Sequence, residues 1–169
     1  MKSKTHDRQQ AGKIVAVKIG HNEHDKELFF LFTANQIEDV LAFVSLQAIP
    51  FAPHFLLGVC SWRNMILPVL DLKQRCTNEQ TADWEKPRYL VVRTGTSVGQ
   101  GPAGLLRCVV RVPADVSTME VPLNSVTCTD AEQHFDQHLI RGAYKTDDQI
   151  YFFPDLLTIL QDQQSIDIF

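Results

Sequence analysis

Long apolar runs are missing from this sequence of 169 residues. No stretch reaches the roughly 18 consecutive apolar residues that a membrane-spanning helix needs, so the sequence predicts no membrane span. The first ten residues are polar, with no apolar run behind their positive charges, and we therefore expect no signal peptide. These absences favour a cytoplasmic protein without direct membrane insertion.

Concentrated positive charge is also missing. Lys and Arg number 16 against 20 Asp and Glu, and the formal net charge is -4. Nucleic-acid binding needs Lys and Arg gathered against phosphate groups, and anionic membrane surfaces attract basic clusters. We therefore expect no nucleic-acid partner, and the charge balance disfavours an OB-type nucleic-acid binder.

Cysteine is scarce and shows no C-x-x-C spacing; the cysteines are Cys60, Cys76, Cys108 and Cys128. We interpret them as reduced, partly buried thiols. No G-x-S-x-G motif is present, and no motif near Ser61 supplies a general base that could activate its hydroxyl. The acidic pairs at 38–39 and 147–148 lie in segments that we interpret as solvated. We expect no catalytic residues, no cofactor and no enzyme activity.

One glycine-rich stretch imitates a nucleotide-binding fingerprint. Gly99, Gly101 and Gly104 spell G-x-G-x-x-G after a predicted strand. A dinucleotide site requires a helix to begin there, because the helix N-terminus receives the pyrophosphate. Residues 105–112 instead predict a strand, which favours a hairpin loop. A small-molecule- or nucleotide-binding β-barrel that uses the loop from Gly95 to Gly104 remains the alternative hypothesis.

Two groups of histidines have spacings that could suit a metal. His134 and His138 would share one face of a helix, and His21 and His24 could meet in a turn beside Asp25. Zinc requires a third and usually a fourth ligand, and the glutamate of the H-E-x-x-H motif is absent. We interpret these histidines as surface residues and expect no metal site.

Short apolar segments separated by turn signals are what the sequence does contain. Strands are predicted at 13–19, 27–33, 56–62, 65–72, 88–94 and 105–112, with a hairpin of 140–143 and 149–153. Two loops are predicted, a crossing loop over a core at 46–57 and a surface loop at 73–87. The weaker patterns predict a helical turn and strand in 34–43, a short strand at 120–126 and a helical or irregular segment at 130–139. A terminal helix is predicted from Pro154 to Gln161. About eight to ten short strands favour an all-β barrel or sandwich.

The turn between the two central strands is the best candidate for a contact with a partner. Arg63 and Asn64 make this turn, and Asn is one of the few residues other than glycine that tolerate positive φ. Arg63 would be exposed there, where its planar fork of donors suits carboxylates and carbonyls. Trp62 is either a core residue, which we favour, or a surface anchor.

The stretch that holds this turn carries Gly58, Arg63, Pro68 and Asp71 at marked positions. This arrangement resembles the signature of CheW-like domains. Departures from it are Ser61, Asn64 and Lys73. Segments at 35–41, 49–53, 139–144 and 150–157 resemble other elements of the family in the same order, so the resemblance covers about residues 13–161.

The resemblance implies a fold and an architecture. The fold is all-β, with two small five-stranded SH3-like barrels packed around a shared hydrophobic core, and with short helices. Residues 13–161 would form this single domain, between a disordered N-terminal tail at 1–12 and a C-terminal tail at 162–169.

The resemblance also implies a non-enzymatic signalling adaptor. Such a protein couples the cytoplasmic tip of a chemoreceptor helical hairpin to a histidine kinase of the CheA type, in the control of chemotaxis. The residues implied on the receptor side are Ile37, Gly58, Trp62, Arg63 and Asn64. The residues implied on the kinase side are Asp39 and Val40, whereas Pro68 and Asp71 are expected to shape the strand.

Overall fold

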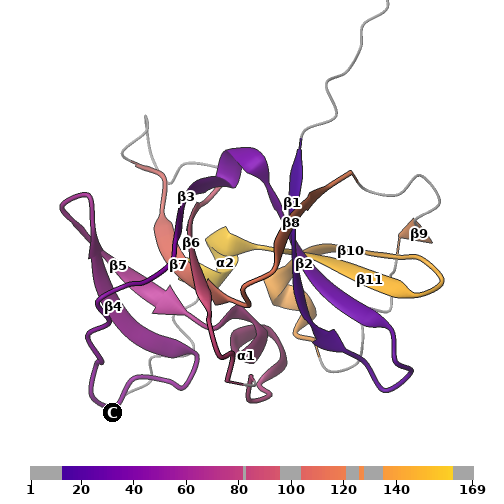
Figure 1. Ribbon diagram of the computed structural model, residues 1–169, viewed down its shortest axis with the longest axis horizontal. Helices are drawn as coiled ribbons and strands as arrows, with labels where there is room; N and C mark the ends of the chain where they lie inside the picture. The colour runs from indigo at the N-terminus through magenta and orange to yellow at the C-terminus, as the bar shows by residue number, and fades with distance from the viewer. Residues whose placement is uncertain (1–12, 82, 96–103, 121–125, 128–134, 162–169) are drawn as a thin grey trace, which may run out of the picture.

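A computed structural model describes residues 13–81, 83–95, 104–120, 126–127 and 135–161. The two predicted tails, most of the Gly95–Gly104 loop, Cys128 and His134 lie outside these residues, as do 121–125. Figure 1 shows two curved lobes side by side, with short helices between them. The predicted all-β fold of two SH3-like barrel lobes with short helices is confirmed.

The first lobe is a six-stranded sheet with the order β8-β1-β2-β11-β10-β9. Its strands are β1 (Ile14–His21), β2 (Glu27–Thr33), β8 (Val116–Met119), β9 (Val126–Thr127), β10 (Ile140–Lys145) and β11 (Gln149–Pro154). The parallel pair β2 and β11 joins the two ends of the described chain in one sheet. The second lobe is therefore inserted, in sequence, between β2 and β8.

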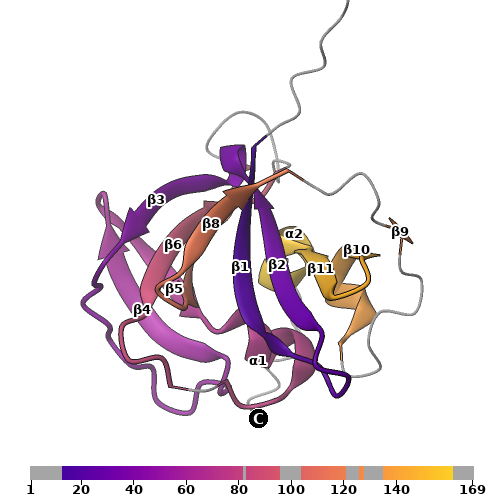
Figure 2. The ribbon, with the colours of Figure 1, turned by 45° about the vertical axis from the view of Figure 1, so that its right-hand side comes forward.

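The second lobe is a five-stranded sheet with the order β3-β6-β7-β5-β4. Its strands are β3 (Ile37–Leu41), β4 (Leu56–Trp62), β5 (Met65–Leu70), β6 (Arg88–Arg93) and β7 (Arg107–Val112). After β3 the chain turns back along β4, where Gln47 and Val59 exchange two backbone hydrogen bonds of 2.8 Å each. The bridge pairs the segment that follows β3, one edge strand, with β4, the other edge strand of the same sheet. The path of this segment can be followed in Figure 2.

The central strands of both sheets are buried on both faces, and this explains their nearly continuous apolar sequences. In β6, Leu90 and Val92 belong to the core that the two lobes share, whereas Val91 belongs to the separate core of the second lobe. In β2, Phe30 and Phe32 face the shared core and Leu31 faces a cluster of the first lobe. The predicted shared hydrophobic core is therefore present.

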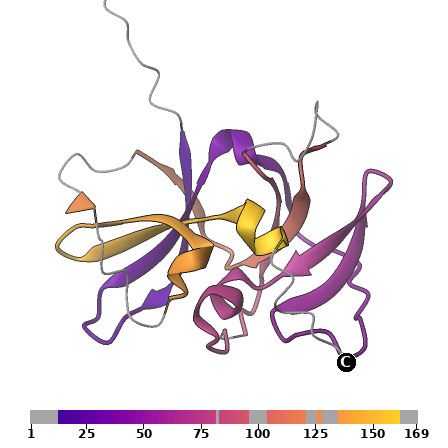
Figure 3. The same ribbon diagram turned by 180° about the vertical axis from the view of Figure 1, so that it is seen from behind.

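The two short α-helices complete the junction between the lobes. They are α1 (Leu72–Thr77) and α2 (Leu156–Gln161), and Leu72, Cys76, Leu156 and Ile159 enter the shared core. Figure 3 shows α2 from behind, between the two sheets. None of the helices in the described ranges is long and apolar enough to cross a membrane.

Two sequence predictions about local structure are wrong. The polar segment 73–87 begins within a helix, because the Asp71 carboxylate caps α1 by accepting a hydrogen bond from the Gln74 amide. Pro154 closes β11, and α2 begins two residues later. The strand predicted at 120–126 falls mainly on residues 121–125, which lie outside the described residues; the described strands on either side of them are β8, which ends at Met119, and the two-residue β9.

The crossing loop at 46–57 is also placed differently from the prediction. We expected its apolar residues to lie over a core; Phe55 does pack, half-buried, against the shared core, but Leu46, Ile49 and Phe51 are exposed. The Gln47–Val59 bridge holds the backbone of this exposed part against the edge of β4 and fixes its path. The segment presents apolar side chains to solvent.

Candidate functional site

The predicted turn between β4 and β5 has the geometry of a tight hairpin. Arg63 and Asn64 have φ values of 44° and 61°, so both central residues are in the left-handed region. Two consecutive positive φ values are the mark of a type I′ turn, which matches the twist of paired strands. The turn exposes Arg63, whose side chain is 66% accessible.

A three-residue cluster joins this turn to β3. The Trp62 indole Nε1 donates a hydrogen bond of 3.0 Å to Asp39 Oδ2. The Arg63 guanidinium lies 4.4 Å from the centre of the Trp62 ring and 3.8 Å from the Asp39 carboxylate. The hydrogen bond from Trp62, with the Val40 amide and the charge of Arg63, holds the pKa of Asp39 below its usual value.

This cluster decides between the two interpretations of Trp62. The side chain is only 8% exposed and packs in the core of the second lobe, so Trp62 is a core residue that also supports Arg63 from below. The cluster also joins residues that the resemblance assigns to different partners. Asp39, implied on the kinase side, contacts Trp62 and Arg63, implied on the receptor side.

Gly58 is buried, and its surroundings explain the glycine. Its φ is 148°, and a Cβ atom added there would lie 2.4 Å from the backbone oxygen of Gln47 and 3.1 Å from Leu46 Cδ1. Only a residue without a side chain allows the backbone of the crossing loop to come this close. In the structure, Gly58 acts by fixing the path of that loop.

We expect Gly58→Ala to lower the free energy of unfolding by about 1–3 kcal/mol, because the new methyl group must push the Gln47 backbone away. Urea unfolding measures this change. The matched control is Gly95→Ala, where an added Cβ would meet nothing within 4 Å and the effect should stay within about 0.5 kcal/mol. Equal stability of the two variants would contradict the packing argument.

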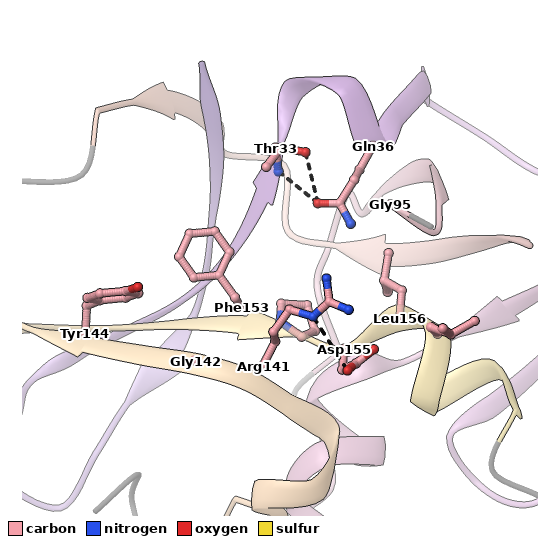
Figure 4. Close-up of a pocket in the computed structure, with 11 residues that line it drawn as sticks. Thr33, Gln36, Gly95, Arg141, Gly142, Tyr144, Phe153, Asp155 and Leu156 are labelled. Atoms are coloured by element: carbon pink, nitrogen blue, oxygen red, sulfur yellow. Dashed lines mark hydrogen bonds and ion pairs between the residues drawn. The ribbon is translucent and has the colours of Figure 1, made fainter. Parts of the chain in front are cut away.

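A groove lies where the first lobe meets α2 and the start of the connection after β6 (Figure 4). Its volume is about 370 Å³. The residues that line it are Thr33, Gln36, Gly95, Arg141, Gly142, Tyr144, Phe153, Pro154, Asp155, Leu156 and Leu157. None of the site residues predicted from the sequence lines this groove, although Ile37 follows Gln36 directly and packs, half-buried, against the shared core.

An arginine with available donors lies in this groove. The side chain of Arg141 is 60% exposed, and its Nε lies 3.7 Å from Asp155 Oδ2. The other carboxylate oxygen of Asp155 accepts a hydrogen bond from the Thr158 amide in the first turn of α2, which fixes the carboxylate. Figure 4 shows Arg141 between the Thr33–Gln36 pair and Asp155, with Phe153 and Leu156 nearby. The groove thus combines apolar walls with one accessible cation.

The described residues give little support for a reactive thiol, a metal site or a dinucleotide site. Burial raises the pKa of Cys76 and of Cys108 to about 12, which keeps both thiols protonated and unreactive. In the described part of the chain, no group of three potential metal-ligating side chains comes together. After the glycine-rich stretch the chain enters β7, and not the helix that a dinucleotide site needs.

Comparisons with known proteins agree with the geometry. A sequence model of the family described as CheW-like domain matches residues 13–164. A search of curated proteins gave no match. Among solved structures, the chain is similar to the scaffolding protein TtCheW from Thermoanaerobacter tengcongensis, with a TM-score of 0.66 and 22% sequence identity over 94% of this chain and 93% of that one. The likeness to that structure shows a shared fold.

Proposed function

Because the chain belongs to the CheW-like domain family, whose members are non-enzymatic chemotaxis scaffolds, we propose that it couples the cytoplasmic tips of chemoreceptors to a histidine kinase of the CheA type. The observation that carries this proposal is the presence of two separate candidate contact surfaces. One is the groove at the lobe junction, and the other is the outer edge of the second lobe.

The groove at the lobe junction is the proposed receptor site. A chemoreceptor tip is a helical hairpin, and a helix with an apolar stripe docks most readily into a groove with apolar walls. Phe153, Leu156 and Leu157 supply such walls, and Arg141 offers donors to a carboxylate beside the stripe. Ile37, at the start of β3, adjoins this groove through Gln36.

The edge strand β3 is the proposed kinase site. Val40 is exposed on this edge strand, and the chain that follows it exposes Phe43. The centres of protein interfaces are poor in charge and rich in aromatic side chains, which fits this part of the surface. Asp39 accepts a hydrogen bond from Trp62, so its proposed role on the kinase side is to fix the position of the edge strand β3.

The cluster at the β4–β5 turn is the proposed link between the two surfaces. Arg63 remains a proposed receptor contact, with Trp62 below it and Asn64 completing the turn. Its ion pair with Asp39 ties this contact to the kinase-side strand. Gly58, which has no side chain, would contribute to receptor binding by fixing the crossing loop.

Two charge changes test whether the surfaces serve different partners. We expect Arg141→Glu to weaken binding of the receptor hairpin by at least about tenfold and to leave kinase binding unchanged. We expect Val40→Asp to do the reverse, because it places a charge on an exposed apolar contact. Separate pull-downs with the purified receptor fragment and with the purified kinase measure both effects. If each variant lost both partners equally, or neither, the proposed division would be wrong.

A further inference from the structure

Phe51 has a backbone conformation that does not suit it. It is the third residue of a four-residue turn, Ile49 to Ala52, closed by a hydrogen bond of 3.3 Å from the Ala52 amide to the Ile49 carbonyl. Pro50 in second place and a φ of 60° at Phe51 are the pattern of a type II turn. The third position of that turn favours glycine or asparagine, and a bulky aromatic residue there is strained.

Burial does not compensate for this strain. The Phe51 side chain is 91% exposed, the largest exposed fraction among the large hydrophobic residues of the described ranges. Phenylalanine therefore destabilises the folded protein at this position and also presents a large apolar surface to water. A strained residue that gains nothing from the fold indicates a contact outside it, because strain is retained where a site uses it.

The chain on either side of Phe51 is mainly apolar and has no charged residues. From Val40 to Trp62 the sequence contains no Asp, Glu, Lys or Arg, although these residues make up 21% of the chain. All the exposed large hydrophobic residues in the described ranges belong to the second lobe; they are Val40, Phe43, Leu46, Ile49, Phe51 and Ile66. Five of these six fall in the segment 40–51.

The segment is held in place as a surface. The Gln47–Val59 bridge attaches it to β4, and the close approach of its backbone to Gly58 leaves it no room to shift inward. Phe51 is therefore presented by a fixed turn, and less side-chain and loop entropy is lost on binding. The exposed residues begin at Val40, so they continue the proposed kinase surface beyond the edge of β3.

We propose that Phe51 is an anchor residue that inserts into an apolar pocket on the regulatory domain of the histidine kinase. This inference rests on the proposed function and extends it, because it assigns the whole exposed segment 40–51, and not only Val40, to the kinase contact. The kinase is the occupant that the observations favour, since the segment without charged residues that presents Phe51 begins at Val40. The partner pocket must itself be apolar, as an aromatic anchor gains its affinity by desolvation.

The test uses a variant in which stability and binding move in opposite directions. Phe51→Asn relieves the strain at positive φ and removes the exposed ring, so we expect the melting temperature to rise by about 2–4 °C. We expect the same variant to bind the purified kinase at least about tenfold more weakly. The matched control is Ile66→Asn, which also removes an exposed apolar side chain from the second lobe but lies outside the segment 40–51. We expect this control to bind the kinase like the wild type.

Isothermal titration with the kinase, pull-down with the receptor fragment and sedimentation velocity of the chain alone distinguish the outcomes. Unchanged kinase affinity of Phe51→Asn, beside a wild type that binds, would overturn the anchor and leave the proposed function intact. If Phe51→Asn kept its kinase affinity but lost receptor binding or self-association, Phe51 would belong to the interface with that other partner. This outcome would also overturn the inference. A wild-type chain that binds no kinase would overturn the proposed function together with it.

Discussion

An Arg63→Glu variant is expected to keep its fold and to lose assembly with the receptor hairpin and the kinase. The Arg63 side chain is 66% exposed and its ion pair with Asp39 spans 3.8 Å, so the pair contributes little to stability. The new carboxylate would instead face Asp39, where like charges repel, and could not stack on Trp62. Loss of an arginine at a contact centre typically costs about 2 kcal/mol or more, roughly 30-fold in affinity.

Co-sedimentation of the chain with both partners measures the effect of Arg63→Glu. Arg63→Lys is the matched control: it keeps the charge but replaces the planar group that stacks on the indole, so an intermediate loss is expected. Circular dichroism should show the same melting temperature for all three proteins. Full recovery of Arg63→Glu in the complex would contradict the role of this turn.

An Asp71→Ala variant is expected to lose about 3–5 kcal/mol of unfolding free energy, because it leaves the positive charge of Arg111 without its buried partner. Asp71 is 1% exposed and accepts three hydrogen bonds, from the Gln74 amide at 3.0 Å, from Thr81 Oγ1 at 2.7 Å and from Arg111 at 3.1 Å. The carboxylate thereby ties α1 and the loop after it to β7. Removing it also removes the cap of α1.

Urea unfolding of Asp71→Ala, with Asp136→Ala as the control, measures this contribution. Asp136 caps the short 3-10 helix Gln137–Leu139 by accepting from the His138 amide, but it is exposed. Its loss should cost only about 1 kcal/mol, as for an ordinary cap. If the two variants were equally destabilised, Asp71 would be a simple cap and not the centre of a buried network.

The strands could be predicted from the sequence because most of their residues are apolar and punctuated by turn residues. Val91 and its neighbours in β6 are buried on both faces, so they form a continuous apolar run. The composition of this run identifies a strand, but without alternation the sequence does not show which residues point to which face. The helix α1 could not be predicted in this way. Its signal is instead a local cap, Asp71 with Gln74 three residues later, whereas the contacts of the same carboxylate with Thr81 and Arg111 form only in the folded chain.

The candidate site was only partly predictable, for a similar reason. The turn signal at Arg63 and Asn64 is local, and the exposure of Arg63 follows from it. The contact of Trp62 with Asp39 is not local, because β3 and β4 are the two edges of their sheet. The groove around Arg141 likewise gathers residues from β2, β10, β11 and α2, and no sequence spacing signals it.

Phe51 illustrates the same limit at one residue. The sequence shows an apolar segment with two prolines, which is equally compatible with a loop over a core and with an exposed turn. Only the φ angle and the accessibility of the side chain separate the two. The strain at this residue becomes visible once the turn type is known.

Reconstitution of the complex from purified parts tests the central claim most directly. The receptor cytoplasmic fragment, assembled on vesicles, and the kinase from the same cells are sedimented with and without this chain. The adaptor function predicts that the kinase sediments with the receptor when the chain is added, and remains mostly in the supernatant without it. Kinase recovery that does not depend on the folded chain would contradict the claim.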